Sequence, residues 1–393
     1  MKFTYALLSL GLAAASPARA VYAPIPEQEQ GKDLSASVRT GLSYDSNIFG
    51  GASDAIGSSV WEVAPRISYN HSLTQQTFVS AAYGLTLTEI TRRPGDKLLD
   101  SHDLTLRAAH AFSQSTTLDV NDAFMIARNP ESLLNGVPLN TDQSFTRNQI
   151  DGRYTLSATE KLGVTAKVRS VNTDYRNAVL GRSLDRIENL YGLAGDYAVL
   201  PETKAVLEYR HQDVFYWTEG ENKNKNSDYL MTGVDYDVAR KLTLSARVGA
   251  EWRHRSREGS TTGPFAELSG RYQYAEKSFL TGGYAYTIDE SSDTARFTDQ
   301  KVNRFFVNVE HSVTALIVAS LSANYEPAVL QGRRSLGIGN LDEAATRLGS
   351  ALSYLPTKNW TISANYDFDN VSSDDPARSV QRHRVGVSAI YAF

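Results

Sequence analysis

The sequence predicts an all-β protein, a transmembrane antiparallel up-and-down β-barrel of about 18 strands, with about 16 as the other possibility. Three observations predict this fold. Apolar and polar residues alternate with a period of two along many segments. The connections between these segments alternate in length, and aromatic residues recur near one end of every second segment. After residue 20, no segment carries an apolar stripe at the helical period.

The first 20 residues have the pattern of a secretory signal peptide. Lys2 precedes an apolar run from Phe3 to Ala15, and Ala18-Arg19-Ala20 supplies the small-x-small cleavage pattern. Cleavage would change the formal charge from −4 to −6, because Lys2 and Arg19 would leave. We therefore expect three parts along the chain: a signal peptide over 1–20, a short periplasmic tail over 21–33, and the barrel over 34–393.

The composition excludes several classes of protein. The chain has no cysteine, which excludes disulfides, thiolate metal sites and cysteine nucleophiles. Its pI near 6.0 lacks the basic footprint of a nucleic-acid binder. No apolar run after the leader is long enough for a membrane-spanning helix. The surplus of 21 Tyr over 3 Met suits strands and membrane–water boundaries.

The segment that opens the predicted barrel shows the alternation clearly. Between residues 34 and 44 every second residue is Leu, Ala, Val, Thr or Tyr, and the residues between them are Ser, Arg or Gly. The same pattern recurs as far as Val385–Phe393, which ends the chain. The expected strands start near residues 34, 60, 77, 102, 117, 144, 162, 187, 203, 228, 242, 263, 278, 303, 317, 344, 360 and 383.

The connections are sorted by length. Tight turns follow the even-numbered strands, and the least clear of them lies at Thr314-Ala315, where apolar residues blur the turn. Long connections rich in Gly, Ser, Asn and Asp follow the odd-numbered strands, at 45–59, 89–101, 130–143, 174–185, 218–227, 289–302, 327–343 and 369–382. Such sorting is typical of an outer-membrane barrel with its N-terminus in the periplasm and its long loops outside the cell.

Aromatic residues mark the ends of the returning strands. They occupy the apolar phase near the end of alternate strands, at Tyr69, Phe112, Tyr154, Tyr197, Tyr236, Tyr274, Tyr354 and Phe393. Because amphipathic rings favour the membrane–water boundary, this recurrence predicts an aromatic girdle on the periplasmic side.

The polar phase of the strands carries many charged residues. A charge on the lipid face of a barrel costs about 2–4 kcal/mol at the midplane, so these residues are expected to line the lumen. Two interpretations stay open: a hydrated conduit for a polar solute, and a wall of mutually neutralising pairs without selectivity. The candidate lumen-lining residues are Arg39, Glu62, Arg66, Asp103, Arg107, Asp119, Asp151, Arg153, Arg169, Glu208, Arg210, Arg247, Glu251, Glu267, Arg271, Arg304, Glu310, Arg347, Asp367 and Arg384.

The third long loop, Pro130–Gln143, is unusually apolar for a loop in water. It mixes Leu133 and Leu134 with Glu131 and Asp142. We expect it to fold inward as a constriction or to lie on the rim.

Two further groups at the strand ends have alternative interpretations. Tyr216 and Trp217 could stack on a sugar ring or belong to an upper aromatic girdle. Four acids could hold a divalent ion near lipopolysaccharide or simply be solvated, and these are Asp367, Asp369, Asp374 and Asp375.

Enzymatic patterns are poor, so we expect no enzyme, no cofactor and no metal. None of the seven histidines sits in a zinc spacing, and no GxSxG or GxxxxGK[ST] motif occurs. Ser101-His102-Asp103 resembles a triad only in sequence, because neighbouring residues on a strand point to opposite faces.

Two short motifs carry a resemblance to known proteins. Gly41–Phe49, with Tyr44, Asp45, Ser46, Asn47 and Phe49, resembles the G-x-x-Y-D-S-N-x-F opening of the family known as β-barrel porin 2, outer-membrane barrels associated with exopolysaccharide or capsule production. This resemblance implies a companion barrel in polysaccharide secretion. Since Asp, Ser and Asn also favour turns, a structural role for the motif is equally open.

The second motif lies at the C-terminus. Val385–Phe393, with Tyr391 and Phe393, resembles the terminal-aromatic strand signal that the outer-membrane assembly machinery reads. This signal is general to such barrels and says nothing about cargo.

Three functions follow as hypotheses for an outer-membrane barrel. The first is a passive conduit, without catalysis, that assists export of an exopolysaccharide or capsular polysaccharide. The alternative is a general or sugar-selective diffusion porin, and the third is a surface scaffold that acts through its long loops. The expected partners are outer-membrane lipid and lipopolysaccharide, the assembly machinery and polysaccharide-export proteins, with no nucleic acid and with the oligomeric state open.

Overall fold

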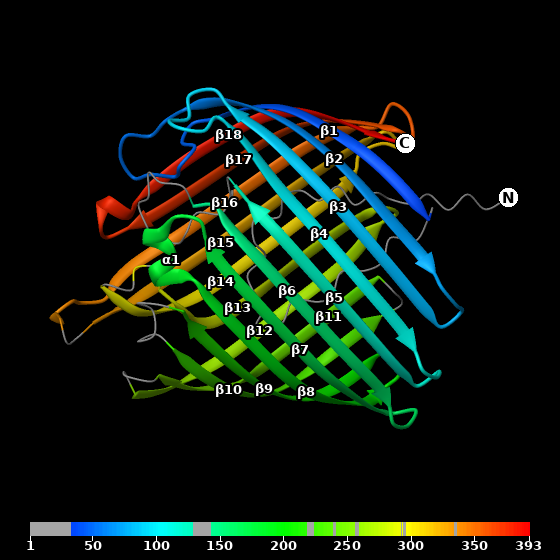
Figure 1. Ribbon diagram of the computed structural model, residues 1–393. Helices are drawn as coiled ribbons and strands as arrows, with labels where there is room; N and C mark the ends of the chain where they lie inside the picture. The colour runs from blue at the N-terminus through cyan, green and yellow to red at the C-terminus, as the bar shows by residue number, and fades with distance from the viewer. Residues whose placement is uncertain are drawn as a thin grey trace.

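The structure, a computed structural model, describes residues 33–128, 143–217, 224–238, 241–255, 259–291, 293, 296–333 and 336–393. Within these residues, eighteen antiparallel strands form one sheet in which each strand pairs with its neighbours in sequence (Figure 1). The first strand, β1, also pairs with the last, β18, from Ser37↔Ala392 to Asp45↔Arg384, and this pairing closes the barrel. The predicted fold class and the strand number of eighteen are confirmed.

The strands are long and follow one another with little other structure between them. Their bounds are β1 Leu34–Asp45, β2 Ser58–Ser72, β3 Thr77–Ile90, β4 Leu98–Ala111, β5 Thr116–Ala127, β6 Phe145–Ser157, β7 Leu162–Tyr175, β8 Arg186–Leu200, β9 Thr203–Tyr216, β10 Lys225–Val238, β11 Leu242–Arg255, β12 Gly259–Ala275, β13 Ser278–Glu290, β14 Phe297–Ser312, β15 Ile317–Gly332, β16 Leu341–Tyr354, β17 Trp360–Ser373 and β18 Val380–Ala392.

Within the described residues, two short helices lie in the long connections. The helix α1, Ala178–Leu184, lies between β7 and β8, and the Asn177 side chain caps it by accepting from the N–H of Val179 at 2.9 Å. A 3-10 helix, Pro376–Arg378, lies between β17 and β18. In the part of the chain that is described, no helix is long and apolar enough to cross a membrane.

Five of the short turns are built around a hydroxyl at their start. The side-chain oxygens of Thr74, Ser113, Thr159, Thr314 and Thr357 each accept a hydrogen bond from the backbone N–H two residues further on. This arrangement replaces a backbone turn bond. It explains the hairpin at Thr314, which forms in spite of the apolar residues that obscure it in the sequence.

Strands that follow a short turn start within one residue of their predicted positions. Most strands that follow a long connection start earlier than predicted: β4 at Leu98 rather than 102, β12 at Gly259 rather than 263, and β14 at Phe297 rather than 303. The reason is physical, because the hydrogen-bonded ladder continues above the apolar belt where the alternation that marks a strand is lost. The connection between β11 and β12 is correspondingly short and leaves only residues 256–258 between the two strands.

The outer face of the barrel is apolar. In the outward phase, side chains such as Val63, Leu207 and Val248 are 45%, 60% and 57% exposed. The predicted aromatic residues lie at the short-turn end, and Tyr69, Phe112, Tyr154, Tyr197, Tyr274, Tyr354 and Phe393 are exposed, while Tyr236 is half-buried. An apolar belt bounded by rings identifies a barrel that spans a membrane.

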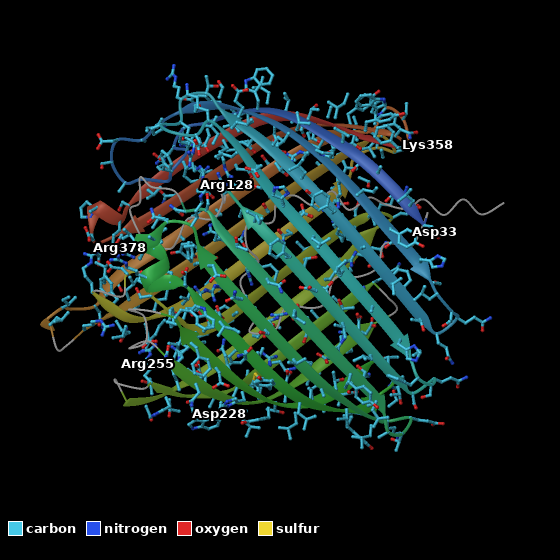
Figure 2. All side chains as sticks on the ribbon, in the orientation of Figure 1. Asp33, Arg128, Asp228, Arg255, Lys358 and Arg378 are labelled. Atoms are coloured by element: carbon cyan, nitrogen blue, oxygen red, sulfur yellow. The ribbon has the colours of Figure 1, made fainter. Side chains whose placement is uncertain are left out.

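The barrel's first strand begins on the short-turn side, and its last strand ends on the same side. Figure 2 labels Asp33 and Lys358 there and Arg128, Arg255 and Arg378 at the opposite, long-loop side. The expected signal peptide and most of the tail, residues 1–32, lie outside the described residues.

Candidate functional site

The inner wall of the barrel is the candidate site. Along β9, the outward side chains of Leu207 and Tyr209 are 60% and 47% exposed. The inward side chains that alternate with them, Glu208 and Arg210, are 1% and 4% exposed. The same alternation holds along the other strands, and the residues predicted to line the lumen all fall in the inward phase. Figure 2 shows how densely polar side chains follow the strands.

Many of the predicted residues form ion pairs with one another. The closest nitrogen–oxygen distances are 3.1 Å for Arg39–Glu62, 2.8 Å for Arg66–Asp103, 2.5 Å for Arg107–Asp119, 3.6 Å for Arg153–Asp119, 2.5 Å for Arg169–Asp151 and 2.8 Å for Arg210–Glu208. Five of these pairs join residues on different strands that the closed sheet brings together, whereas Arg210 and Glu208 lie two residues apart on β9. They agree with a wall that neutralises its own charges locally.

Other predicted residues pair with acids or bases outside the predicted set. Arg247 pairs with Asp235, Glu251 with Arg253, Arg304 with Glu326 and Asp289, and Arg384 with Asp369. Arg271 lies over the ring of Phe279 at 4.7 Å. Among the described residues, Glu267, Glu310 and Arg347 have no ion pair within 4 Å.

A chain of charges crosses β11, β13 and β14 near the long-loop end. Arg253 Nη1 and Arg255 Nη1 each lie 2.6 Å from an oxygen of Asp299, and Arg253 also donates to the carbonyl of Ile288. Arg253, Arg255 and Asp299 are all buried. Sequence reasoning missed Asp299 because residues 289–302 were expected to be a loop. The signal that could have found it is the Glu251, Arg253, Arg255 alternation, which continues above the apolar belt.

A buried mixed cluster lies beside these charges on β9, β10 and β12. Tyr229, Met231 and Phe265 pack together on the inner side and are nearly fully buried. The Tyr229 hydroxyl lies 3.1 Å from both Gln212 Oε1 and Glu251 Oε1. The Arg210 guanidinium lies 5.8 Å from the centre of the Phe265 ring, so it combines a salt bridge with an aromatic contact.

The opposite wall is different in character. The inward phase of β15–β18 and β1 carries many small residues, among them Ser43, Ser320, Ser322, Gly349, Ala351, Ser363, Gly386 and Ser388. Ser353 and Ser363 form a buried hydroxyl pair at 2.8 Å. These small residues leave space beside the inward charges Arg347, Asp367 and Arg384 on the same strands.

The residues of the Gly41–Phe49 motif build the start of a loop that folds inward. Asp45 is buried, and its carboxylate pairs with Arg382 of β18 and accepts the N–H of Asn47 at 2.9 Å. Asn47 is 1% exposed, and its side chain bonds both the N–H and the carbonyl of Gly51. The Ser46 hydroxyl accepts the N–H of His383 at 2.8 Å. In this structure the motif ties the loop to the seam between β1 and β18.

The rest of that loop packs on the inner side of the rim. Ile48 forms a buried cluster with Ile90 and Leu99, which both lie in the inward phase of β3 and β4. Phe49 lies under the Arg93 guanidinium at 5.5 Å. Tyr44 points outward, and its hydroxyl lies where a side chain on Gly57 would be, so a larger residue at position 57 would displace the Tyr44 ring.

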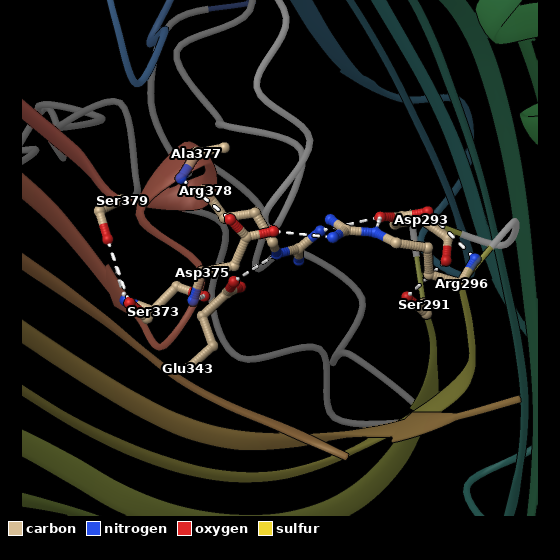
Figure 3. A network of polar contacts seen from close by, with 9 residues as sticks. All are labelled: Ser291, Asp293, Arg296, Glu343, Ser373, Asp375, Ala377, Arg378 and Ser379. Atoms are coloured by element: carbon tan, nitrogen blue, oxygen red, sulfur yellow. Dashed lines mark hydrogen bonds and ion pairs between the residues drawn. The ribbon is translucent and has the colours of Figure 1, made fainter. Parts of the chain in front are cut away.

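A second inward-folding group joins the β13–β14 and β17–β18 connections (Figure 3). Arg378 is 1% exposed, and it bonds Glu343 of β16 at 2.9 Å and Asp293 at 3.4 Å. Arg296 bonds Asp293 at 2.6 Å and Asp375 at 2.7 Å. Both guanidinium groups lie over the Phe297 ring, at 5.3 and 5.6 Å. The Arg296 guanidinium holds the pKa of Asp375 below its ordinary value.

Several other predicted sites have a plain outcome. Tyr216 is buried in the inward phase and Trp217 is exposed, so the two rings do not form one stacking platform. Asp369 and Asp375 are engaged by Arg384 and Arg296, and no group of potential metal ligands occurs among the residues described. The expected constriction loop, with Glu131, Leu133, Leu134 and Asp142, lies outside the described residues.

The apparent triad at Ser101–Asp103 does not converge. His102 bonds Asp100 and the hydroxyl of Tyr83 on the outer side, whereas Asp103 pairs with Arg66 on the inner side. The Ser101 hydroxyl accepts the N–H of Arg128. The alternation of the strand places His102 on the opposite face from Ser101 and Asp103, so the three side chains do not converge.

The C-terminal residues close the barrel at the short-turn end. Phe393 donates its N–H to the carbonyl of Ala36 at 2.9 Å, and its ring meets that of Tyr391 edge to face at 4.8 Å. Trp360 contacts the other side of Tyr391 at 5.0 Å between ring centres. The terminal aromatic residues therefore lie at the seam, on the outer face.

One cavity of about 750 Å³ lies on β15–β18, β1 and β2. Its lining includes the outward residues Leu42, Tyr44, Leu352 and Tyr366. It belongs mainly to the lipid-facing side, and we do not count it as part of the inner wall.

Fold and inner wall together define the class: a membrane-spanning antiparallel β-barrel of eighteen strands in the described residues, with a charged and largely self-paired interior. No protein-family model matches the chain, and no curated protein sequence matches it either. The resemblance of Gly41–Phe49 to the β-barrel porin 2 family therefore stays a prediction.

Three solved structures are similar to this chain over most of its length, with TM-scores below 0.5. OccAB3 of Acinetobacter baumannii is 13% identical, with 92% of this chain and 100% of that chain covered and a TM-score of 0.47. The outer membrane protein opdK of Pseudomonas aeruginosa is 9% identical over 92% and 99%, with a TM-score of 0.48. OccK2 (OpdF) of Pseudomonas aeruginosa in complex with glucuronate is 11% identical over 92% and 98%, with a TM-score of 0.49. At such values, the glucuronate of that complex says nothing about the solute of this chain.

Proposed function

We propose that this protein is an outer-membrane β-barrel that provides a passive diffusion pathway for small polar solutes and performs no chemical step. Its N-terminus would lie in the periplasm and its long loops outside the cell. The apolar belt supports the membrane location, and the sorting of short turns and long connections supports the orientation.

The observation that carries this proposal is the asymmetric inner wall. On one side, buried charges such as Arg210, Glu208 and Arg253 are held in place by ion pairs. On the other side, the small residues of β15–β18 and β1 leave room beside them. A polar solute that moves along the small-residue wall would meet fixed charges and hydroxyls that replace part of its hydration shell.

Two inward-folding groups favour small solutes over a polymer. Ile48 anchors the β1–β2 connection to the inner rim, and Arg378 with Arg296 anchors the connections around β14 and β18. These contacts narrow the mouth with buried, mutually bonded groups. A long polysaccharide would need a wide and flexible opening, and these contacts do not favour such an opening.

Liposome swelling tests the proposal. Vesicles with the reconstituted protein should swell in monosaccharides, amino acids and small organic acids at rates that fall as solute size rises. Swelling no faster than that of protein-free vesicles would contradict it.

A pair of variants on β16 locates the pathway. Ala351→Trp places a large ring on the small-residue wall and should slow swelling. Leu352→Trp, one residue further on and 55% exposed on the outer face, should leave swelling unchanged and is the matched control. Equal effects of both variants would argue that solutes do not pass along this wall.

Export of an exopolysaccharide or capsular polysaccharide is the second candidate, supported by the resemblance of Gly41–Phe49 alone. In that case, polymer would accumulate in the periplasm when the protein is deleted, and polysaccharide-export proteins would be its partners. Normal surface polymer in the deletion strain would exclude it. The Phe393 terminus would be read by the assembly machinery in either case.

A further inference from the structure

The outer face of β5–β8 breaks the apolar belt. Five polar residues lie there in the outward phase, and we call them the polar outer patch: Asp122, Asn148, Ser170, Asn172 and Asn189. Asp122 is opposite Leu106 on β4 and Ile150 on β6, which are 42% and 43% exposed on the outer face. It lies near the middle of β5, Thr116–Ala127, and thus at the depth of the membrane interior.

The patch is continuous across four strands. The register places Asp122 opposite Ile150, Ile150 opposite Ser170, and Ser170 opposite Asn189. Asn148 is opposite Asn172 in the next row toward the loops. The polar groups therefore form one diagonal band that runs from the middle of the belt toward the long-loop side.

The patch has few hydrogen-bonding partners within the chain. Ser170 donates to Asn189 Oδ1 at 2.8 Å, and the Asn172 amide donates to Asp174 at 2.8 Å. In the described part of the chain, the Asp122 and Asn148 side chains form no hydrogen bond, and the Oδ1 atoms of Asp122, Asn148 and Asn172 are covered by the chain's own side chains. The partly exposed remainder of these polar groups faces hydrocarbon tails, which offer no hydrogen-bonding partner. Polar side chains in a membrane normally face protein or water.

We propose that the polar outer patch is an interface with a second copy of this chain in the membrane. Copies with the same orientation are related by an axis along the membrane normal, so each residue meets the other copy at about the same depth. An asparagine amide carries both donors and acceptors, so Asn148 and Asn172 are complementary to themselves. The Asp122 carboxylate is complementary to the amide of Asn148, its diagonal neighbour on β6. The inference concerns assembly and does not depend on the solute that the barrel carries.

Site-specific crosslinking tests the interface, because the chain has no cysteine of its own. Asn148→Cys and Asn172→Cys should each give a disulfide-linked dimer of this chain in native membranes under mild oxidation. Ser350→Cys, in the outward phase of β16 on the far wall, should remain uncrosslinked and is the matched control. A crosslink to a different protein, or crosslinking equal to that of Ser350→Cys, would overturn the proposal.

A mass measurement provides the second arm. The purified wild-type protein in lipid nanodiscs should have the mass of an oligomer. The triple variant Asp122→Leu, Asn148→Leu, Asn172→Leu should have the mass of one chain while remaining a folded barrel, since leucine suits the lipid face. Thr40→Leu, Thr346→Leu, Ser350→Leu makes the same kind of change on the far wall and should stay oligomeric. A monomeric wild-type protein, or a triple patch variant that stays oligomeric, would contradict the interface.

Discussion

At the scale of single residues, burial and pairing together decide how much a charged group affects the stability of the barrel. Arg382 is 3% exposed and Asp45 is 4% exposed, and the two groups satisfy each other at the seam between β18 and β1. By contrast, Arg39 and Glu62 pair in a more open part of the lumen, where side-chain exposures are 44% and 26%. An exposed pair of that kind contributes about 0–1 kcal/mol, whereas a broken buried pair leaves an uncompensated charge.

The Asp45–Arg382 pair gives a prediction about stability. Asp45→Ala leaves the Arg382 guanidinium buried and unpaired, which should lower the free energy of unfolding by about 3–5 kcal/mol. Urea unfolding of the barrel in lipid vesicles measures this difference. Asp45→Leu combined with Arg382→Leu should recover most of the loss, because two apolar groups replace the pair. A double variant that is less stable than Asp45→Ala would contradict the explanation.

The Arg253, Arg255 and Asp299 group gives a prediction about ion selectivity. Asp299→Asn removes the acid shared by two buried arginines, so the inner wall near the long loops becomes more positive. The preference for anions over cations should rise by roughly threefold, a modest fraction of the interaction between unit charges at contact. The reversal potential of a planar bilayer under a KCl gradient reports this ratio. Asp374→Asn, in the β17–β18 connection at the same end of the barrel, is the control, and equal shifts for both variants would argue against a specific role of Asp299.

At the scale of elements, the strands and turns were largely predictable and the loop contacts were not. The period-two pattern located the strands after short turns to within one residue, because both faces of those strands cross the apolar belt. The predicted starts of β4, β12 and β14 lie too far along the sequence. The hydrogen-bonded ladder of these strands extends beyond the lipid, where alternation of apolar and polar residues is no longer required. The contacts of Arg378 with Glu343 and Asp293 join three separate stretches of chain, and no local pattern marks such a meeting.

The link between the β13–β14 and β17–β18 connections should depend on acid. Hydrogen bonding to Arg296 lowers the pKa of Asp375 from its usual 3.8, so the link contributes its full stabilisation above that value. It is lost as the pH falls through the lower, folded-state pKa. Because the Arg296 and Asp375 side chains are partly exposed to solvent, at 41% and 24%, we expect local loosening rather than unfolding of the barrel.

Hydrogen exchange in residues 374–379 measures this loosening. Exchange, corrected for its intrinsic pH dependence, should rise between neutral pH and pH values well below 3.8. In Asp375→Asn it should be raised already at neutral pH and should respond little to acid. A variant with the pH response of the wild-type protein would show that another group controls the segment.

At the scale of the whole molecule, the sequence was sufficient for the closed barrel and for which residues face inward. The lumen candidates could be named from their phase, because a charge in the apolar phase would meet lipid. Their pairing could not be named, since Arg66–Asp103 and Lys167–Glu208 each skip a strand and depend on curvature. The small inward residues of β15–β18 and of β1 likewise become one surface only when β18 closes on β1.

The same closure gives the Gly41–Phe49 motif its place. Asp45 and Asn47 contact β18 residues more than 300 positions away in sequence, so the turn-favouring run holds β1 and β18 together at the seam. The polysaccharide hypothesis would in addition require this run to recognise a partner or a polymer. In the barrel itself, its contacts are those of a structural anchor.

Single-channel recording in planar bilayers tests the central claim, a water-filled pathway through the barrel, most directly. Purified folded protein should give stable open steps, and Ala351→Trp should reduce the step size while Leu352→Trp should not. A silent bilayer that demonstrably contains folded protein, or steps that neither variant changes, would contradict the account.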